Sequence, residues 1–195
     1  MATGFGARCI GRLGGGDVSV NTYYVPSTDS TALYEGDFVK VVDTTGAMDS
    51  NAEYITVTRA ATGDPILGVI KGFKPDPSLP YTGKIRAAST ARYVHVIDDP
   101  KAIYEIQEDA VGGAVTAALV GSLSNADIIV AAGSSVTGLS GTMLDSNTAA
   151  ASAEDLKIIG VRRDGSNVAA QSGGAILHVM ILNANHALVK TDSQA

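Results

Sequence analysis

The sequence contains a single cysteine, Cys9, and no tryptophan. One cysteine excludes an intrachain disulfide and any metal site built from several thiolates. The apolar runs of the sequence are all shorter than the roughly 18 residues needed for a membrane-spanning helix. Residues 1–16 also lack the continuous apolar segment that is typical of a signal peptide. We therefore expect neither a membrane anchor nor a secretory leader, and we expect folding in a reducing cytoplasm.

Charge is scarce as well. Charged residues make up 17% of the chain, the net charge is −6, and the only adjacent basic pair is Arg162 and Arg163. Nucleic-acid binding by phosphate neutralisation is therefore disfavoured. With 195 residues, 45% of them hydrophobic, the chain can bury a substantial core. The surface must then be rich in Ser, Thr, Ala and Gly, which suits either permanent contact with a partner or a crowded β-sandwich.

Motifs for metal binding and nucleophilic catalysis are missing. The three histidines, His95, His178 and His186, form no H-x-x-H or H-E-x-x-H pattern. We expect His95 and His178 to be structural residues inside apolar strands and His186 to lie near an exposed end. Convergence of His95, His178 and an aspartate is the metal alternative that spacing leaves open. The segment GLSGT at 138–142 begins like a serine elbow but ends in Thr142, so we interpret it as a loop.

Acidic side chains cluster near the middle of the chain, at Asp98 and Asp99 and at Glu105, Glu108 and Asp109. A glycosidase would need two such carboxyls facing each other across a groove. Neighbours on a turn or strand are more commonly solvated, and only 5% of the residues are aromatic, which disfavours a sugar-stacking platform. We therefore predict no catalytic residues, no metal, no cofactor and no enzymatic activity.

The chain is organised around residues 63–109, where three short runs rich in Ile, Val and Tyr are bounded by Asp, Pro or Gly. These runs, at 66–71, 92–97 and 103–107, have the signature of strands. Asp98, Asp99 and Pro100 form a tight connection between the last two. We predict a β-hairpin over 92–107, with 66–71 as a strand of the same core.

Further strand signals recur every 10 to 25 residues, and no long amphipathic helix interrupts them. This spacing predicts an all-β fold, a single β-sandwich or barrel. The Gly-Gly pair at 112–113 allows one helical turn at most near 111–123, and residues 133–152 form a long loop with a short strand at 142–144. The run 176–182 is continuously apolar and predicts a strand buried on both faces. The remaining predicted strands are at 38–42, 54–59, 126–131 and 156–162.

Three regions follow from composition. Residues 1–22 are Gly-rich and predict an extended N-terminal arm, with a frayed terminus as the alternative. Residues 23–187 form the β domain, and residues 188–195 a disordered polar tail. Within the domain, residues 74–80 carry three prolines and predict a stiff exposed loop. A faint echo relates ILGV at 66–69 to IIGV at 158–161, which indicates either a duplicated β-unit or a chance match.

Several segments taken in order resemble one known family. They are Gly4-Phe5 with Arg8 and Gly14-Gly15, GDFV at 36–39, ILGV at 66–69, VIDDP at 96–100 with IYEIQ at 103–107, SGTMLD at 140–145, LKIIGV at 156–161 and the closing segment 179–183. This series resembles the small head proteins of tailed bacteriophages, of the decoration or cement type. The resemblance implies a jelly-roll-like or barrel-like domain that assembles as a homotrimer. It also implies a mechanical role, bridging neighbouring major capsid proteins after the head expands and resisting the pressure of packaged DNA.

From this resemblance we expect the partners to be the major capsid protein and other copies of the chain, with no nucleic acid and no membrane. The expected location is the outer capsid surface, after synthesis in the host bacterial cytoplasm. Residues 1–26 are expected to supply the contact, so that their deletion spares folding and abolishes binding. The alternative function is a host- or glycan-binding module of the virion surface or tail. The expected contact side chains are Phe5, Arg8, Arg12, Tyr23 and Tyr24.

Overall fold

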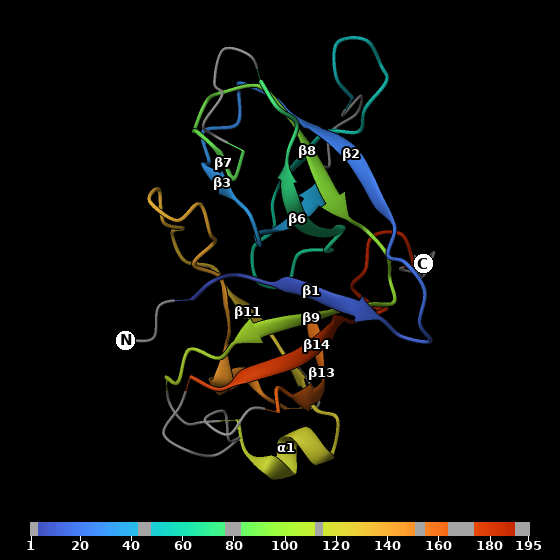
Figure 1. Ribbon diagram of the computed structural model, residues 1–195, viewed down its shortest axis with the longest axis vertical. Helices are drawn as coiled ribbons and strands as arrows, with labels where there is room; N and C mark the ends of the chain where they lie inside the picture. The colour runs from blue at the N-terminus through green and yellow to red at the C-terminus, as the bar shows by residue number, and fades with distance from the viewer. Residues whose placement is uncertain are drawn as a thin grey trace, which may run out of the picture.

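The computed structural model describes residues 4–42, 48–76, 83–111, 115–150, 155–163 and 174–189. These residues form a nearly all-β molecule in which antiparallel sheets pack in a sandwich-like arrangement, so the predicted fold class is confirmed (Figure 1). The one short helix, α1, spans Ala117–Gly121, in agreement with the single helical turn expected there. A 3₁₀ turn spans Ser146–Thr148.

Two five-stranded sheets account for most of the fold. Sheet I consists, in spatial order, of β1 (Arg8–Arg12), β9 (Ala102–Gln107), β14 (Ile176–Ile181), β13 (Leu156–Val161) and β10 (Asn125–Ala126). Sheet II consists of β2 (Val20–Val25), β8 (Arg92–Ile97), β6 (Gly68–Phe73), β4 (Phe38–Val41) and β5 (Val57–Arg59). Two small pairs complete the fold, β3 (Leu33–Tyr34) with β7 (Ile85–Arg86) and β11 (Ile128–Ile129) with β12 (Met143–Leu144). In Figure 1 sheet II occupies the upper half, and sheet I with α1 the lower half.

Sheet II curls until its two edge strands meet. Tyr24 of β2 forms a parallel bridge with Thr56, and its N–H donates to the carbonyl of Ile55 at 3.0 Å. The result is a nearly closed barrel with its own core of ten buried residues. Side chains of β2 point alternately into and out of this barrel: Tyr23 and Val25 are buried, and Tyr24 faces outward.

A second core joins the two sheets. It takes Phe38, Val69 and Ile97 from sheet II and packs them against apolar side chains of β9, β13 and β14. Strand β14 contributes only alternate residues to this core, so the predicted burial on both faces is wrong. Sheet I is antiparallel with one face on the core, and the outward-facing residues of β14, such as Met180, are half-buried.

The predicted hairpin over residues 92–107 is also wrong. Strands β8 and β9 form where expected, but β8 pairs with β2 and β6, whereas β9 pairs with β1 and β14. The corner between β8 and β9 leads the chain from sheet II into sheet I, so β9 does not fold back onto β8. Asp98 accepts hydrogen bonds from Asn21 and Tyr23 of sheet II, whereas Asp99 accepts one from Arg12 of sheet I.

The N-terminal residues are extended, as predicted, but they do not form a separate arm. Strand β1 pairs with β9 from Arg8 to Arg12, and β2 pairs with β8 along its whole length. Deleting residues 1–26 would therefore remove one strand from each sheet, contrary to the expectation that folding would be spared. The expected disordered tail lies almost wholly outside the described residues, as does the tip of the proline-rich loop beyond Asp76.

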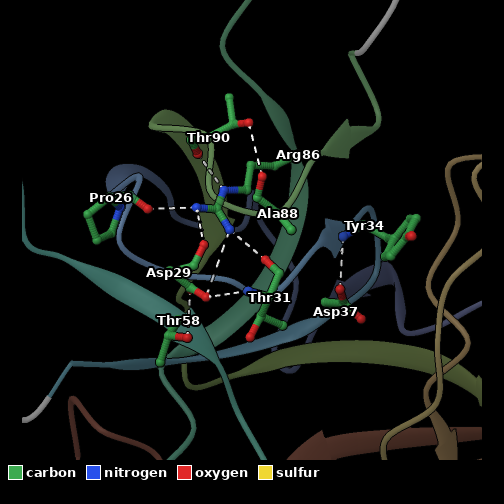
Figure 2. Close-up of polar contacts among 9 residues, drawn as sticks. All are labelled: Pro26, Asp29, Thr31, Tyr34, Asp37, Thr58, Arg86, Ala88 and Thr90. Carbon is green, nitrogen blue, oxygen red and sulfur yellow. Dashed lines mark hydrogen bonds and ion pairs between the residues drawn. The ribbon is translucent and has the colours of Figure 1, made fainter.

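One buried arginine organises the upper end of the barrel. The side chain of Arg86 is fully inaccessible, and its guanidinium donates to the carbonyls of Pro26, Asp29, Thr31 and Thr90 (Figure 2). The nearest Asp29 carboxylate oxygen is 3.9 Å away. The planar fork therefore satisfies four backbone acceptors at once and fixes the connection between β2 and β3.

The similarity between residues 66–69 and 158–161 has a structural counterpart, but with a different alignment of the two segments. Gly72 of β6 lies opposite His95 just after a β-bulge, and Gly160 of β13 lies opposite His178 just after another. The duplication remains a hypothesis, and the matching glycines are 72 and 160 rather than 68 and 160.

Candidate partner-binding groove

A groove of about 640 Å³ runs between β1 of sheet I and β6 of sheet II. Arg8 and Cys9 line one wall, and Ile70 and Lys71 line the other. Phe5 lies immediately before β1 and also lines the groove. Because its two walls come from different sheets, the groove depends on how the N-terminal segment crosses from one sheet to the other.

That crossing depends on two glycines. Gly6 and Gly36 have φ values of +73° and +91°, in the left-handed region that favours glycine. The N–H of Ala7 donates to the carbonyl of Gly36 at 3.0 Å, and a Cβ on Gly6 would lie 2.7 Å from that same carbonyl oxygen. The N-terminal segment can approach sheet II this closely only because no side chain stands between them.

A buried carboxylate secures the same crossing. Asp37 is inaccessible to solvent and accepts hydrogen bonds from the Tyr34 N–H at 2.8 Å, drawn in Figure 2, and from the Ser140 hydroxyl at 2.5 Å. Burial raises the pKa of Asp37, while these hydrogen bonds oppose the rise. Ser140 belongs to the long loop predicted at 133–152, and that loop contains the expected short strand as β12. One role of the loop is thus to hold the base of the groove.

Strand β1 offers a backbone edge. Within the described ranges, β1 pairs with β9 alone. A bulge between Cys9 and Gly11 leaves Ile10 without a cross-strand partner, and the Ile10 side chain is 45% exposed. Leu13, just past the strand, is 53% exposed. An unpaired edge with adjacent apolar side chains is a typical template for pairing with another chain.

The charges around the groove are mixed. Arg8 pairs with Glu105 at 2.5 Å, and its guanidinium lies 5.8 Å from the centre of the Phe5 ring. Lys84 lies 3.6 Å from Glu35. Lys71 is exposed on the β6 wall and makes no salt bridge within the described part of the chain. The groove therefore carries a local cationic side chain on a protein whose overall charge is negative.

The titratable groups do not form a nucleophile or a metal centre in the part of the chain that the structure covers. Burial raises the pKa of the Cys9 thiol, which therefore stays protonated at neutral pH. His95 of β8 contacts the Thr22 hydroxyl at 3.2 Å, and His178 of β14 lies 3.4 Å from Glu105. These two histidines therefore lie in different sheets. No group of three potential metal ligands occurs among the described residues.

His186 differs from its prediction. It was expected near an exposed end, but its side chain is completely buried. Its Nδ1 accepts the N–H of Leu188 at 3.2 Å, and its backbone bridges to Ile66. Burial lowers the pKa of His186, although Asp98 and Asp99 oppose that change. The chain after β14 therefore returns to the core at His186.

The five expected contact residues lie in four different places. Phe5 and Arg8 lie together at the groove. Arg12 pairs with Asp99 at 2.6 Å and supports the corner between the sheets. Tyr23 is a core residue, 6% exposed, which removes it from the contact set. Tyr24 faces outward from the barrel into a different cavity.

Sequence reasoning missed the opposite wall of the groove and the neighbours of Tyr24. Lys71 and Ile70 reach the groove only because β6 lies beside β1 after the chain crosses between sheets. Tyr93 lies opposite Tyr24 through the β2–β8 register. The two tyrosines themselves were visible in the sequence. That the strands carrying them pair with each other could not be inferred from residue spacing.

None of the helices in the described ranges is both long and apolar enough to cross a membrane. Comparison of the chain with protein-family profiles, with curated proteins and with solved structures found no match.

Proposed function

We propose that the protein is a virion structural protein that binds the outside of the expanded phage head and cements neighbouring major capsid proteins. The observation that carries this proposal is the unpaired edge of β1 beside a groove, with Ile10 and Leu13 exposed next to it. The ordered resemblance to phage decoration proteins supplies the identity of the partner.

In this proposal the contact is not made by a free N-terminal arm that wraps around a neighbouring protein. Since β1 is already held by β9, it acts as a template on which an extended segment of the capsid protein adds a further strand. The main-chain hydrogen bonds supply affinity, and the groove between β1 and β6 receives alternate side chains of that segment.

Assembly as a homotrimer on the shell is part of the proposal. A contact of one strand is modest by itself, and three copies joined around one capsid position multiply it through avidity. The negative net charge suits the outer surface, away from packaged DNA.

The test compares charged variants of the edge in binding to expanded, undecorated heads. Ile10→Lys and Leu13→Lys place a cation on the proposed contact, and we expect each to lose co-sedimentation while keeping the circular dichroism spectrum of the wild type. Leu123→Lys is the matched control, because Leu123 is 46% exposed beside α1, at the other end of sheet I. Equal binding by all three variants would rule out the β1 edge.

A further inference from the structure

A second cavity, of about 430 Å³, opens on the outer face of the barrel and shares no lining residue with the groove. Tyr24 of β2 and Tyr93 of β8 lie directly opposite each other there, with ring centres 5.3 Å apart and planes tilted by 48°. Tyr54 packs edge-on against Tyr93 at 5.0 Å. Three of the seven tyrosines of the chain are therefore gathered at one place.

The rings are held in fixed orientations. The Tyr93 hydroxyl donates to Asp49 at 3.3 Å, and the other oxygen of Asp49 accepts the N–H groups of Glu53 and Tyr54. A binding surface whose side chains are already ordered loses less conformational entropy when it binds a ligand.

The rim adds polar groups to the aromatic floor. The ammonium of Lys74 lies 5.2 Å from the centre of the Tyr93 ring, and the Lys74 N–H donates to the Tyr93 carbonyl at 3.0 Å. The guanidinium of Arg92 donates to the carbonyl of Ile85 at 2.7 Å, which ties this wall to β7. Pro75 also lines the cavity. The site thus combines half-buried aromatic rings with a hydrogen-bond donor at its mouth.

We propose that this cavity binds the pyranose ring of a carbohydrate. The C–H groups on the apolar face of a sugar are attracted to the electron-rich face of an aromatic ring. The Lys74 ammonium supplies a donor for ring hydroxyls. The volume falls within the range of about 300–1,000 Å³ that is usual for small-molecule sites.

Other ligand classes fit less well. The ammonium of Lys74 at the rim repels a cationic ligand but not a neutral one. A nucleic acid could stack on the same rings, but Asp49 beneath them and the net charge of −6 disfavour a polyanion. The sugar site does not depend on the capsid-binding proposal.

The absence of tryptophan makes tyrosine fluorescence a direct readout. The probes are the methyl glycosides of glucose, galactose, mannose and N-acetylglucosamine, each titrated into the full chain at millimolar concentrations. We expect at least one to change the tyrosine fluorescence saturably and to show saturation-transfer NMR signals from its C–H groups. Failure of all four to bind would overturn the proposal, as would binding of oligothymidylate in their place.

Two sets of variants locate the site. Tyr24→Phe keeps the ring and should bind as the wild type, whereas Tyr24→Leu keeps apolar bulk without a ring and should bind about tenfold more weakly. If Tyr24→Leu does not fold, Lys74→Ala is compared with Lys101→Ala, a matched control at an exposed position just before β9. Loss of affinity in Lys74→Ala alone supports the site, and equal effects of the two lysine variants contradict it.

Discussion

The hydroxyl of Tyr23 donates a hydrogen bond of 2.6 Å to Asp98, and this contact joins β2 to the corner where the chain leaves sheet II for sheet I. Both residues are buried. Burial raises the pKa of Tyr23, and the neighbouring Asp98 carboxylate raises it further. The phenol is therefore a neutral donor across the whole physiological pH range, and the corner keeps its hydrogen bond.

Removing that hydroxyl should destabilise the fold. Tyr23→Phe leaves a buried carboxylate oxygen of Asp98 with only the Asn21 amide as donor, so we expect a loss of about 1–3 kcal/mol in the free energy of unfolding. Urea denaturation measures it. Tyr34→Phe is the control, since the Tyr34 hydroxyl makes no hydrogen bond within the described residues, and it should change stability by less than about 0.5 kcal/mol.

The buried guanidinium of Arg86 should be more sensitive than any exposed charge. Arg86→Lys keeps the charge but cannot reach four carbonyls, and we expect a loss of about 3–5 kcal/mol. Lys84→Ala breaks an exposed pair with Glu35 and should cost no more than about 1 kcal/mol. Similar melting temperatures for the two variants would contradict the proposed role of Arg86.

Two glycines of the same strand provide a sharp test of the register between β6 and β8. A Cβ on Gly68 would lie 2.1 Å from the carbonyl oxygen of Ile97, whereas a Cβ on Gly72 would meet nothing closer than 3.9 Å. Gly68→Ala must displace backbone and should destabilise the protein by about 3 kcal/mol or prevent folding. Gly72→Ala should be nearly neutral, and a reversed order in thermal unfolding would show that the register is different.

Asp155 should make the protein less stable as the pH rises through the weakly acidic range. Burial raises its pKa to about 6, although the N–H groups of Ile128 and Gly63 donate to the carboxylate. Between pH 3.8 and about 6 the folded state binds a proton that the unfolded chain has released, so the free energy of unfolding falls with increasing pH. Asp155→Asn should remove this slope in urea titrations at several pH values, and exposed Asp17→Asn should leave it unchanged.

His186 should act in the opposite direction over an overlapping range. Its pKa is lowered by burial, so its contribution to stability is complete above the unfolded value of 6.5 and is lost as the pH falls below it. His186→Asn can still accept the Leu188 N–H and should abolish this acid sensitivity. An unchanged pH profile in the variant would mean that His186 titrates alike in both states.

The positions of several strands followed from the sequence, whereas those of β1, β3 and β7 and the pairing of the strands did not. The Ile-, Val- and Tyr-rich runs at β8 and β9 were placed within a residue, because local composition determines where a strand forms. Their separation into two sheets depends on side chains far away in sequence, Tyr23 and Arg12, which hold the two aspartates of the corner. Spacing alone favours a hairpin there.

In the candidate sites, too, some residues could be predicted from the sequence and others depend on the tertiary fold. Phe5 and Arg8 were predicted as contact residues and do lie at the groove, yet its second wall, with Lys71, is defined only by the tertiary fold. Low aromatic content argued against a sugar platform. The pairing of β2 with β8 and the bend after Asp49 nevertheless bring Tyr24, Tyr54 and Tyr93 together.

The central claim is the proposed binding to the outside of the expanded head, and the most direct test is a titration of the purified protein against expanded, undecorated heads of the proposed source phage. Sedimentation of the heads, followed by quantification of bound protein, gives the occupancy. The account predicts saturable binding at a fixed ratio to the major capsid protein, in multiples of three copies per site. Protein that stays in the supernatant at every concentration, with its fold and the heads intact, would contradict it.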